Sequence, residues 1–364
     1  MIRVEGLTKR YGATTVLDGL DFTVAAGETL VLFGPSGAGK TVLLRALAGA
    51  VVPEAGRVFI GEQDVTDRAP EERGVGMAFQ NYALFPHMTA FENIASPLRA
   101  RGLGRDAIRA GVTDIATLLK IDHVVGHAPK ALSNGQKQRT ALARALVAEP
   151  EVLLLDDPLR NVDAKLRFEM RLELPRLLAG RGATVIYVTQ DYKEAMALGD
   201  RIAVLAAGRI VQIGTPEEIY TAPATVEIAK LFGDPTINLL EAVPEKDEGG
   251  VFLRISDQRV ALGADLGAAV GRACLAGLRP EALSFAAAGI PVESEAETPF
   301  NEKTVTLALT RRRRESLVSR PAGTPGPTSG PAHVAIDPAQ VLVFDRETGA
   351  RIALGQGAAA EAAA

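Results

Sequence analysis

Short apolar runs alternate with segments of helical period over residues 1–235 of the chain. The runs at 29–33, 152–155 and 184–189 are almost continuously apolar, as strands covered on both faces are. The segment at 42–48 has the spacing of a buried helix and is followed by a glycine. Strands and helices in this alternation predict an α/β domain built on a largely parallel sheet.

Two stretches of residues 1–235 depart from that alternation. Residues from about 90 to 145 are richer in helical spacing, which predicts a helical subdomain inserted into the α/β domain. Apolar runs at 202–205 and 209–213 flank Ala-Ala-Gly, which is typical of a β-hairpin.

The pattern changes after residue 235, where helical spacing largely disappears. Short β-like runs occur at 251–255 and 274–278, with Gly and Pro between them. This predicts a small β-rich, OB- or barrel-like domain at 236–355. A Pro- and Gly-rich stretch at 319–331 predicts a mobile loop, and the low-complexity tail at 356–364 is expected to be disordered.

Composition narrows the classes of function. The chain has 364 residues, of which 47% are hydrophobic, so it can bury the cores of two or more domains. Its net charge of −4 gives no reason to expect nucleic acid as a partner. One cysteine excludes an intramolecular disulfide and favours a reducing compartment. No run approaches the roughly 18 apolar residues of a membrane span, so work at a membrane would be peripheral.

The strongest chemical signal is the sequence Gly-Pro-Ser-Gly-Ala-Gly-Lys-Thr at 34–41. It fits the phosphate-binding loop G-x-x-x-x-G-K-[ST], and it lies between the predicted strand at 29–33 and the predicted helix at 42–48. Backbone N–H groups of such a loop, together with a helix N-terminus, bind phosphate oxygens. Lys40 would reach the β- and γ-phosphates of ATP, and the Thr41 hydroxyl would hold Mg²⁺.

Five further features follow a fixed order along the chain. They are Tyr11, Gln80, the run Leu-Ser-Asn-Gly-Gln at 132–136, the run Leu-Leu-Leu-Asp-Asp-Pro at 153–158, and Gln190. This order resembles the ATPase subunits of ABC transporters, and more closely the importer ATPases of the maltose and glycerol-3-phosphate type. The resemblance covers nearly the whole chain, although residues 296–331 match poorly.

The resemblance implies a P-loop nucleotide-binding domain of the ABC type with an inserted helical subdomain, followed by a β-rich accessory domain. It also implies ATP and Mg²⁺ as ligands. The residues implied to bind ATP are Tyr11, Gly34, Pro35, Ser36, Gly37, Ala38, Gly39, Lys40, Thr41, Val42, Ser133, Asn134, Gly135 and Gln136. Those implied for Mg²⁺ are Thr41, Gln80 and Asp156, and those implied for catalysis are Asp157, Gln190 and Gln80. In this family Ser133 and Gly135 would complete the site of a partner ATPase.

Four positions depart from the family pattern. Asp157 stands where the family has Glu, so its carboxylate stem is one methylene shorter, and a displacement of about 1 Å can cost roughly 100-fold in rate. Gln190 replaces a His and cannot carry charge. Asn134 replaces a Gly and adds bulk near the phosphate, and Arg160 replaces a small residue in a segment that crosses the dimer interface. These changes favour a site that binds ATP but hydrolyses it slowly.

The weakened site suggests a role in an assembly. We expect an importer ATPase for a sugar, polyol, glycerol or glycerol phosphate, acting as the weakly hydrolytic half of a heterodimer. Its partners would be a second ATPase subunit, two transmembrane permease subunits and, indirectly, an extracytoplasmic solute-binding protein, at the cytoplasmic face of the plasma membrane. Alternatives are an active homodimeric ATPase, a mainly regulatory nucleotide-binding subunit, and a soluble non-transport ABC protein. The last fits poorly, because the chain has one cassette and no sustained heptads.

Overall fold

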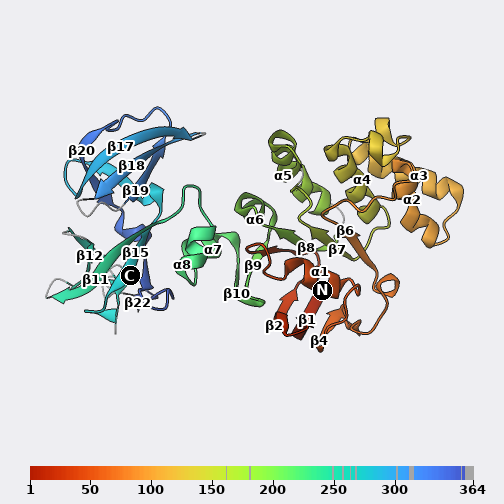
Figure 1. The fold of residues 1–364 in the computed structure, drawn as a ribbon, viewed down its shortest axis with the longest axis horizontal. Helices are drawn as coiled ribbons and strands as arrows, with labels where there is room; N and C mark the ends of the chain where they lie inside the picture. The colour runs from red at the N-terminus through yellow and green to blue at the C-terminus, as the bar shows by residue number, and fades with distance from the viewer. Residues whose placement is uncertain are drawn as a thin grey trace, which may run out of the picture. The chain divides into compact units, whose positions relative to one another are not determined.

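The computed structural model describes residues 1–160, 162–179, 182–247, 250–255, 258–262, 264–266, 269–300, 302–310, 315–353 and 355–356 (Figure 1). The chain divides into two compact units, Met1–Pro216 and Glu217–Ala364. The predicted domain boundary at residue 235 stays a prediction, since this division falls earlier. Apart from Gln356, the predicted disordered tail lies outside the described residues.

A six-stranded sheet forms the centre of the first unit, in the order β10–β9–β3–β8–β7–β6. All neighbours are parallel except β10 and β9, which form the predicted hairpin. Every residue of β3, β7 and β8 is buried, as their apolar sequences predict. The strands are β3 Thr29–Phe33, β6 Val75–Ala78, β7 Val152–Asp156, β8 Thr184–Thr189, β9 Arg201–Ala206 and β10 Arg209–Gly214.

A second, antiparallel sheet of four strands shares a hydrophobic core with the central sheet. Its strands, in spatial order, are β2 Thr14–Val24, β1 Ile2–Tyr11, β4 Ala55–Ile60 and β5 Gln63–Asp64. Helix α1, Lys40–Leu47, contributes Leu43 and Leu44 to this core, and both are completely buried. The helix that follows the phosphate loop is therefore fixed by apolar contacts along its buried face.

Three helices lie in the region where the sequence predicts a helical subdomain, at about 90–145, and they contact one another (Figure 1). They are α2 Ala90–Ala100, α3 Arg105–Leu118 and α4 Asn134–Leu146, with 3₁₀ turns at Asp122–Val124 and Pro129–Ala131. Thr89 and Glu92 form a capping box at the start of α2, and Ser133 and Gln136 form one at the start of α4. Helices α5 Ala164–Ala179 and α6 Tyr192–Leu198 complete the unit, with a 3₁₀ turn at Pro70–Glu72. Among the residues that the structure describes, no helix combines the length and apolar character that a membrane span needs.

The second unit is β-rich, as predicted, and begins with helices α7 Pro216–Thr221 and α8 Val226–Leu231. Two five-stranded antiparallel sheets follow, in the orders β13–β12–β11–β15–β21 and β16–β20–β17–β18–β19, with a strand pair β14–β22. The strands are β11 Asn238–Asp247, β12 Gly250–Ile255, β13 Gln258–Ala261, β14 Ala264–Asp265, β15 Cys274–Leu278, β16 Leu283–Ala286, β17 Ile290–Phe300, β18 Lys303–Thr310, β19 Glu315–Pro321, β20 Gly330–Ile336, β21 Val341–Asp345 and β22 Gly355–Gln356. Short 3₁₀ turns lie at Pro280–Ala282 and Pro338–Gln340.

One core joins the two sheets of this unit. The buried Asn238 amide also bridges them: its nitrogen donates to the carbonyls of Leu278 at 3.0 Å and Leu317 at 2.9 Å, and its oxygen accepts from the Leu317 N–H at 2.6 Å. The loop predicted at 319–331 is shorter in the structure, because β19 continues to Pro321 and β20 begins at Gly330.

Candidate active site

Ten of the predicted site residues line an open cavity of about 210 Å³ in the first unit. It lies beyond the carboxyl ends of β3, β7 and β8, which is where ligands bind in open α/β sheets. Its lining is Val16, Ser36, Gly37, Gly39, Lys40, Thr41, Val42, Gln80, Asp156, Asp157, Arg160, Val188 and Gln190. Val16 and Val188 were not predicted, because no motif marks an apolar side chain beside a phosphate site.

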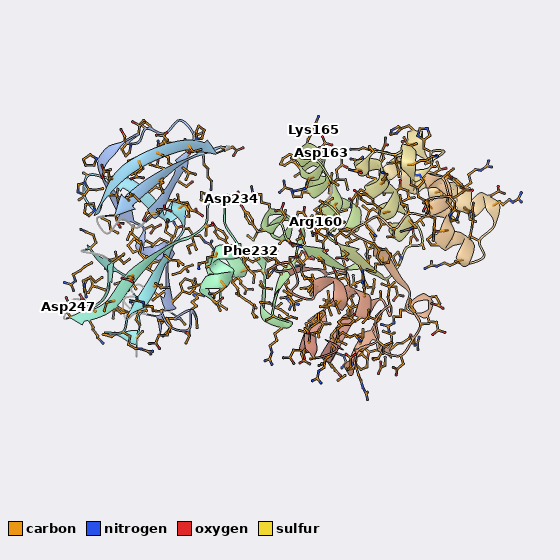
Figure 2. The ribbon with its side chains drawn as sticks, in the orientation of Figure 1. Arg160, Asp163, Lys165, Phe232, Asp234 and Asp247 are labelled. Carbon is orange, nitrogen blue, oxygen red and sulfur yellow. The ribbon has the colours of Figure 1, made fainter. Side chains whose placement is uncertain are left out.

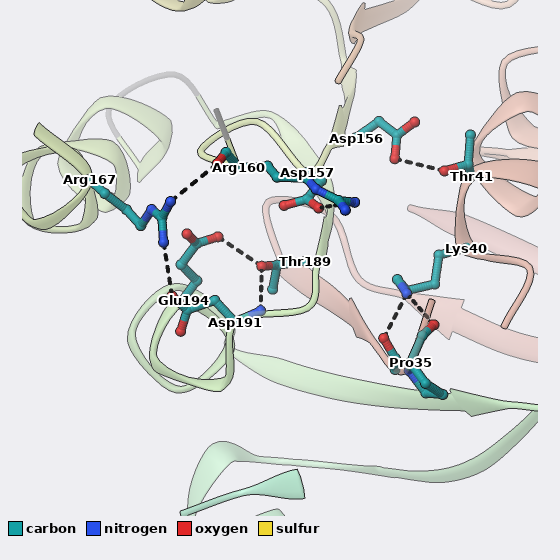
Figure 3. Close-up of polar contacts among 11 residues, drawn as sticks. Pro35, Lys40, Thr41, Asp156, Asp157, Arg160, Arg167, Thr189, Asp191 and Glu194 are labelled. Atoms are coloured by element: carbon teal, nitrogen blue, oxygen red, sulfur yellow. Dashed lines mark hydrogen bonds and ion pairs between the residues drawn. The ribbon is translucent and has the colours of Figure 1, made fainter. Parts of the chain in front are cut away.

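Lys40 holds the phosphate loop together. It begins α1, and its ammonium donates to the carbonyls of Gly34 at 2.7 Å and Pro35 at 2.8 Å (Figure 3). Lys40 is 5% exposed, and this burial lowers its pKa from the usual value, while Asp157 and Asp156 oppose the shift. The ammonium is therefore fixed at the N-terminus of α1, where an anion also meets the positive end of the helix dipole.

Two glycines of the loop allow close backbone packing. A β-carbon on Gly39, which has φ 103°, would lie 2.8 Å from the carbonyl oxygen of Val16. One on Gly34 would lie 2.2 Å from the carbonyl oxygen of Leu205. Neighbouring backbone thus holds the loop on two sides, and any side chain at these positions would displace it.

Thr41 and Asp156 form a pair of oxygen ligands suited to Mg²⁺. The Thr41 hydroxyl donates to Asp156 Oδ1 at 3.1 Å, and Asp156 is 3% exposed at the end of β7 (Figure 3). Burial raises the pKa of Asp156, and the hydrogen bond from Thr41 opposes that shift. Within the described ranges no cluster of three or more His, Cys, Asp or Glu could hold a metal ion. Mg²⁺ is commonly held by one or two protein oxygens together with substrate phosphates and water, so the pair fits it.

Asp157 lies next to this pair on the far wall of the cavity. Its φ of 45° turns the chain sharply, and its N–H donates to the Val188 carbonyl at 2.9 Å. The carboxylate is buried and faces the guanidinium of Arg160, with Oδ2 and Nη1 3.6 Å apart (Figure 3). Burial raises the pKa of Asp157, and Arg160 opposes that shift. The sequence placed Arg160 in an interface segment only, whereas the structure brings it into the cavity.

Gln80 and Gln190 line the same cavity from the ends of two strands, β6 and β8. A buried network that the sequence did not reveal fixes the chain beside Gln190. Glu194 Oε2 accepts hydrogen bonds from the hydroxyls of Tyr187 at 2.9 Å and Thr189 at 2.8 Å, and Thr189 Oγ1 accepts from the Asp191 N–H at 3.0 Å. The apolar pattern of β8 conceals this network, because Tyr and Thr are also typical strand residues.

The remaining predicted residues do not line this cavity. Tyr11 is 51% exposed, and the Lys9 ammonium lies over its ring, 5.2 Å from the ring centroid. Pro35 contributes its carbonyl to Lys40, and Ala38 is buried in the core.

The segment 133–136 also lies outside the cavity lining, as residues that act on a partner's site would. Ser133 Oγ accepts from the Gln136 N–H at 3.3 Å, so the segment caps α4. Asn134 is exposed, begins α4 and has no positive φ, so its backbone does not need the freedom of glycine.

Comparison with known proteins identifies the family. A family model described as "ABC transporter" matches residues 17–160. The sn-glycerol-3-phosphate import ATP-binding protein UgpC of Yersinia pseudotuberculosis is 39% identical over 355 residues, covering 96% of this chain and 99% of that protein. The chain belongs to the ABC transporter family of ATPases.

Two further comparisons agree with this assignment. The trehalose/maltose import ATP-binding protein MalK of Thermococcus litoralis is 42% identical over 80% of this chain and 82% of that protein. A solved structure, titled as a dimeric post-hydrolysis state of the ATP-binding cassette MJ0796 bound to ADP and Pi, is 28% identical with a TM-score of 0.56. It covers 59% of this chain and 99% of that chain. The predicted fold class of an ABC cassette followed by a β-rich part is confirmed.

The packing around the loop makes a testable prediction. Gly39→Ala should lower the stability of the nucleotide-free chain by about 1–3 kcal/mol more than Gly37→Ala, because overpacking against fixed backbone costs that much. Gly37 is the matched control: its φ is also positive, at 81°, but nothing lies within 4 Å of an added β-carbon. Chemical denaturation of both variants measures the difference, and equal losses would contradict this packing.

Proposed function

We propose that this chain is the ATP-binding subunit of an ABC importer for a sugar, polyol, glycerol or glycerol phosphate. The relatives named for sn-glycerol-3-phosphate import and for trehalose/maltose import support this substrate class. The observation that carries the proposal is the cavity itself, which unites the phosphate-loop Lys40, the Thr41–Asp156 pair and the Asp157 carboxylate.

Each wall of the cavity has a separate task in this proposal. Lys40 and the N–H groups at the start of α1 bind the phosphates, and Thr41 and Asp156 hold Mg²⁺ with help from Gln80. When bound, Mg²⁺ supplies positive charge that neutralises the phosphate oxygens. Asp157 accepts a hydrogen bond from the attacking water and orients it. Tyr11 stacks on the base from its exposed position at the end of β1.

The same geometry supports slow hydrolysis. Asp157 is held by its turn, and its side chain is one methylene shorter than the Glu of the family, so its carboxylate has little reach toward a water. Gln190 can donate a hydrogen bond to the terminal phosphate, but it supplies no charge for the transition state. ATP binding uses other groups, chiefly Lys40 and Thr41, and is retained.

The assembly proposed for this subunit is a heterodimer of ATPases. The segment 133–136 of this chain would complete the site of a more active partner, while the partner's equivalent segment would close the cavity described above. The dimeric cassette of known structure supports pairing of such domains. Two transmembrane permease subunits, and a solute-binding protein acting through them, would complete an importer with this chain at the cytoplasmic face of the plasma membrane.

Steady-state ATP turnover tests the weakened site. The double variant Asp157→Glu, Gln190→His should turn over about 100-fold faster than the wild type, because it restores the reach of the carboxylate and a chargeable side chain. Both proteins are compared at equal, measured nucleotide occupancy. Lys40→Ala in each background is the control for contaminating ATPases. Equal turnover of wild type and double variant would mean that the substitutions are tolerated and would favour an active homodimer.

Purification of the native complex tests the assembly. A tag on this chain should recover a second, different ATPase subunit in a one-to-one ratio, together with permease subunits. Quantitative mass spectrometry of the intact complex gives the ratio. A complex that contains this chain as its only kind of ATPase subunit would rule out the heterodimer.

A further inference from the structure

The cavity contains an arginine to which the proposed function gives no task. Among the lining residues, the charged side chains are two cations, Lys40 and Arg160, and two carboxylates, Asp156 and Asp157. The four charges balance, and Gln190 adds none. Arg160 is close enough to Lys40 to depress the pKa of that ammonium, so the two cations act on the same small volume.

The two cations differ in how firmly they are held. Lys40 is 5% exposed and fixed by two short hydrogen bonds to the loop. The side chain of Arg160 is 49% exposed, and its ion pair with Asp157 spans 3.6 Å, which is longer than a good hydrogen bond. A guanidinium has five donors in a planar fork that matches a phosphate group bidentately. Arg160 therefore has both the freedom and the chemistry to bind another anion.

The position of Arg160 indicates which phosphate it would meet. The loop and Lys40 form one wall of the cavity, whereas Asp157 and Arg160 follow β7 on the facing wall (Figure 3). A chain of phosphates anchored along the loop presents its terminal group to the facing wall. A nucleoside diphosphate is one group shorter and would leave Arg160 with Asp157.

We propose that Arg160 binds the terminal phosphate of ATP within its own chain and thereby distinguishes ATP from ADP. This inference rests on the proposed function, since it assumes that the cavity binds ATP. It also gives ATP a second effect on the site. When the guanidinium moves to the phosphate, Asp157 loses its partner and its carboxylate becomes available to orient water.

Nucleotide affinities measured by calorimetry test this assignment. In the presence of Mg²⁺, Arg160→Ser should weaken binding of the non-hydrolysable analogue AMP-PNP by about tenfold or more, which is the cost of one charged hydrogen bond. ADP affinity should change by less than about twofold, within the usual effect of a surface substitution. Arg160→Lys keeps the positive charge but lacks the planar guanidinium. Its affinity for AMP-PNP should therefore lie between those of the wild type and Arg160→Ser.

A matched control removes a different cation from the same segment. Lys165 lies at the exposed start of α5 and does not line the cavity (Figure 2). Lys165→Ser should leave the ratio of AMP-PNP to ADP affinity unchanged. The measurements are made at concentrations at which light scattering shows a monomer, so that a contact with a partner's nucleotide cannot contribute.

Asp157→Asn provides a second test, because it removes the competitor for Arg160. It should tighten AMP-PNP binding, and most of that gain should disappear when Arg160→Ser is added. If Asp157→Asn tightens AMP-PNP binding equally with and without Arg160, Asp157 does not compete with the phosphate for that arginine.

Three results would overturn the assignment to Arg160. One is equal weakening of AMP-PNP and ADP by Arg160→Ser, and another is an effect confined to the dimer. Failure of the wild-type chain to bind either nucleotide would overturn the proposed function as well, so the two failures can be told apart.

Discussion

Two positive and two negative side chains in one small, partly buried cavity determine what this protein can do. They are two cations, Lys40 and Arg160, and two carboxylates, Asp156 and Asp157. All except the half-exposed Arg160 are buried, where interactions between charges are strong. Burial disfavours the charged form of both carboxylates and raises the pKa of each. The neighbouring hydroxyl and guanidinium oppose those shifts. A polyphosphate with Mg²⁺ adds charges of both signs, so it can enter without leaving any one group unpaired.

The scaffold assembles this cavity from segments far apart in the sequence. Parallel strands β3, β7 and β8 end at the same edge of the central sheet, so the residues that follow them lie together. Completely buried side chains of α1 fix the helix N-terminus against that edge. Close backbone packing at Gly34 and Gly39 then holds the loop itself. The rigid part of the site therefore binds phosphate, while its more exposed part, around Arg160 and Gln190, is left to respond to the ligand.

The strand that leads into the phosphate loop could be predicted from the sequence, for physical reasons. The strand at 29–33 has the predicted bounds, because four consecutive apolar residues between Thr29 and a glycine-rich loop allow few other structures. The place of Arg160 could not be predicted in the same way. It depends on the turn at Asp157, whose φ of 45° and hydrogen bond to the Arg160 N–H bring residue 160 back toward the strand end. No local pattern marks such a turn at an aspartate.

The second unit shows a different limit to what the sequence can predict. Strand β18 was not predicted. An alternating strand is expected to bury its apolar residues and expose its polar ones, whereas in β18 the threonines are buried. The buried positions are Thr304, Thr306, Ala308 and Thr310, whereas the larger apolar residues between them, Val305, Leu307 and Leu309, are only partly buried. Threonine is common in strands, but its hydroxyl group makes the sequence of a buried sheet face resemble that of an exposed one. Short apolar runs separated by Gly and Pro indicated the β-rich character of the unit, but they did not indicate how its strands pair.

A crystal structure of the chain with Mg²⁺ and AMP-PNP tests the central claim most directly. We expect Mg²⁺ at Thr41 and Asp156 and the Lys40 ammonium on the β- and γ-phosphates. We also expect the Arg160 guanidinium on the terminal phosphate and away from Asp157. A nucleotide whose phosphates lie outside this cavity would contradict the assignment of the site. A nucleotide bound as expected, with Arg160 still paired to Asp157, would contradict the role given to the arginine.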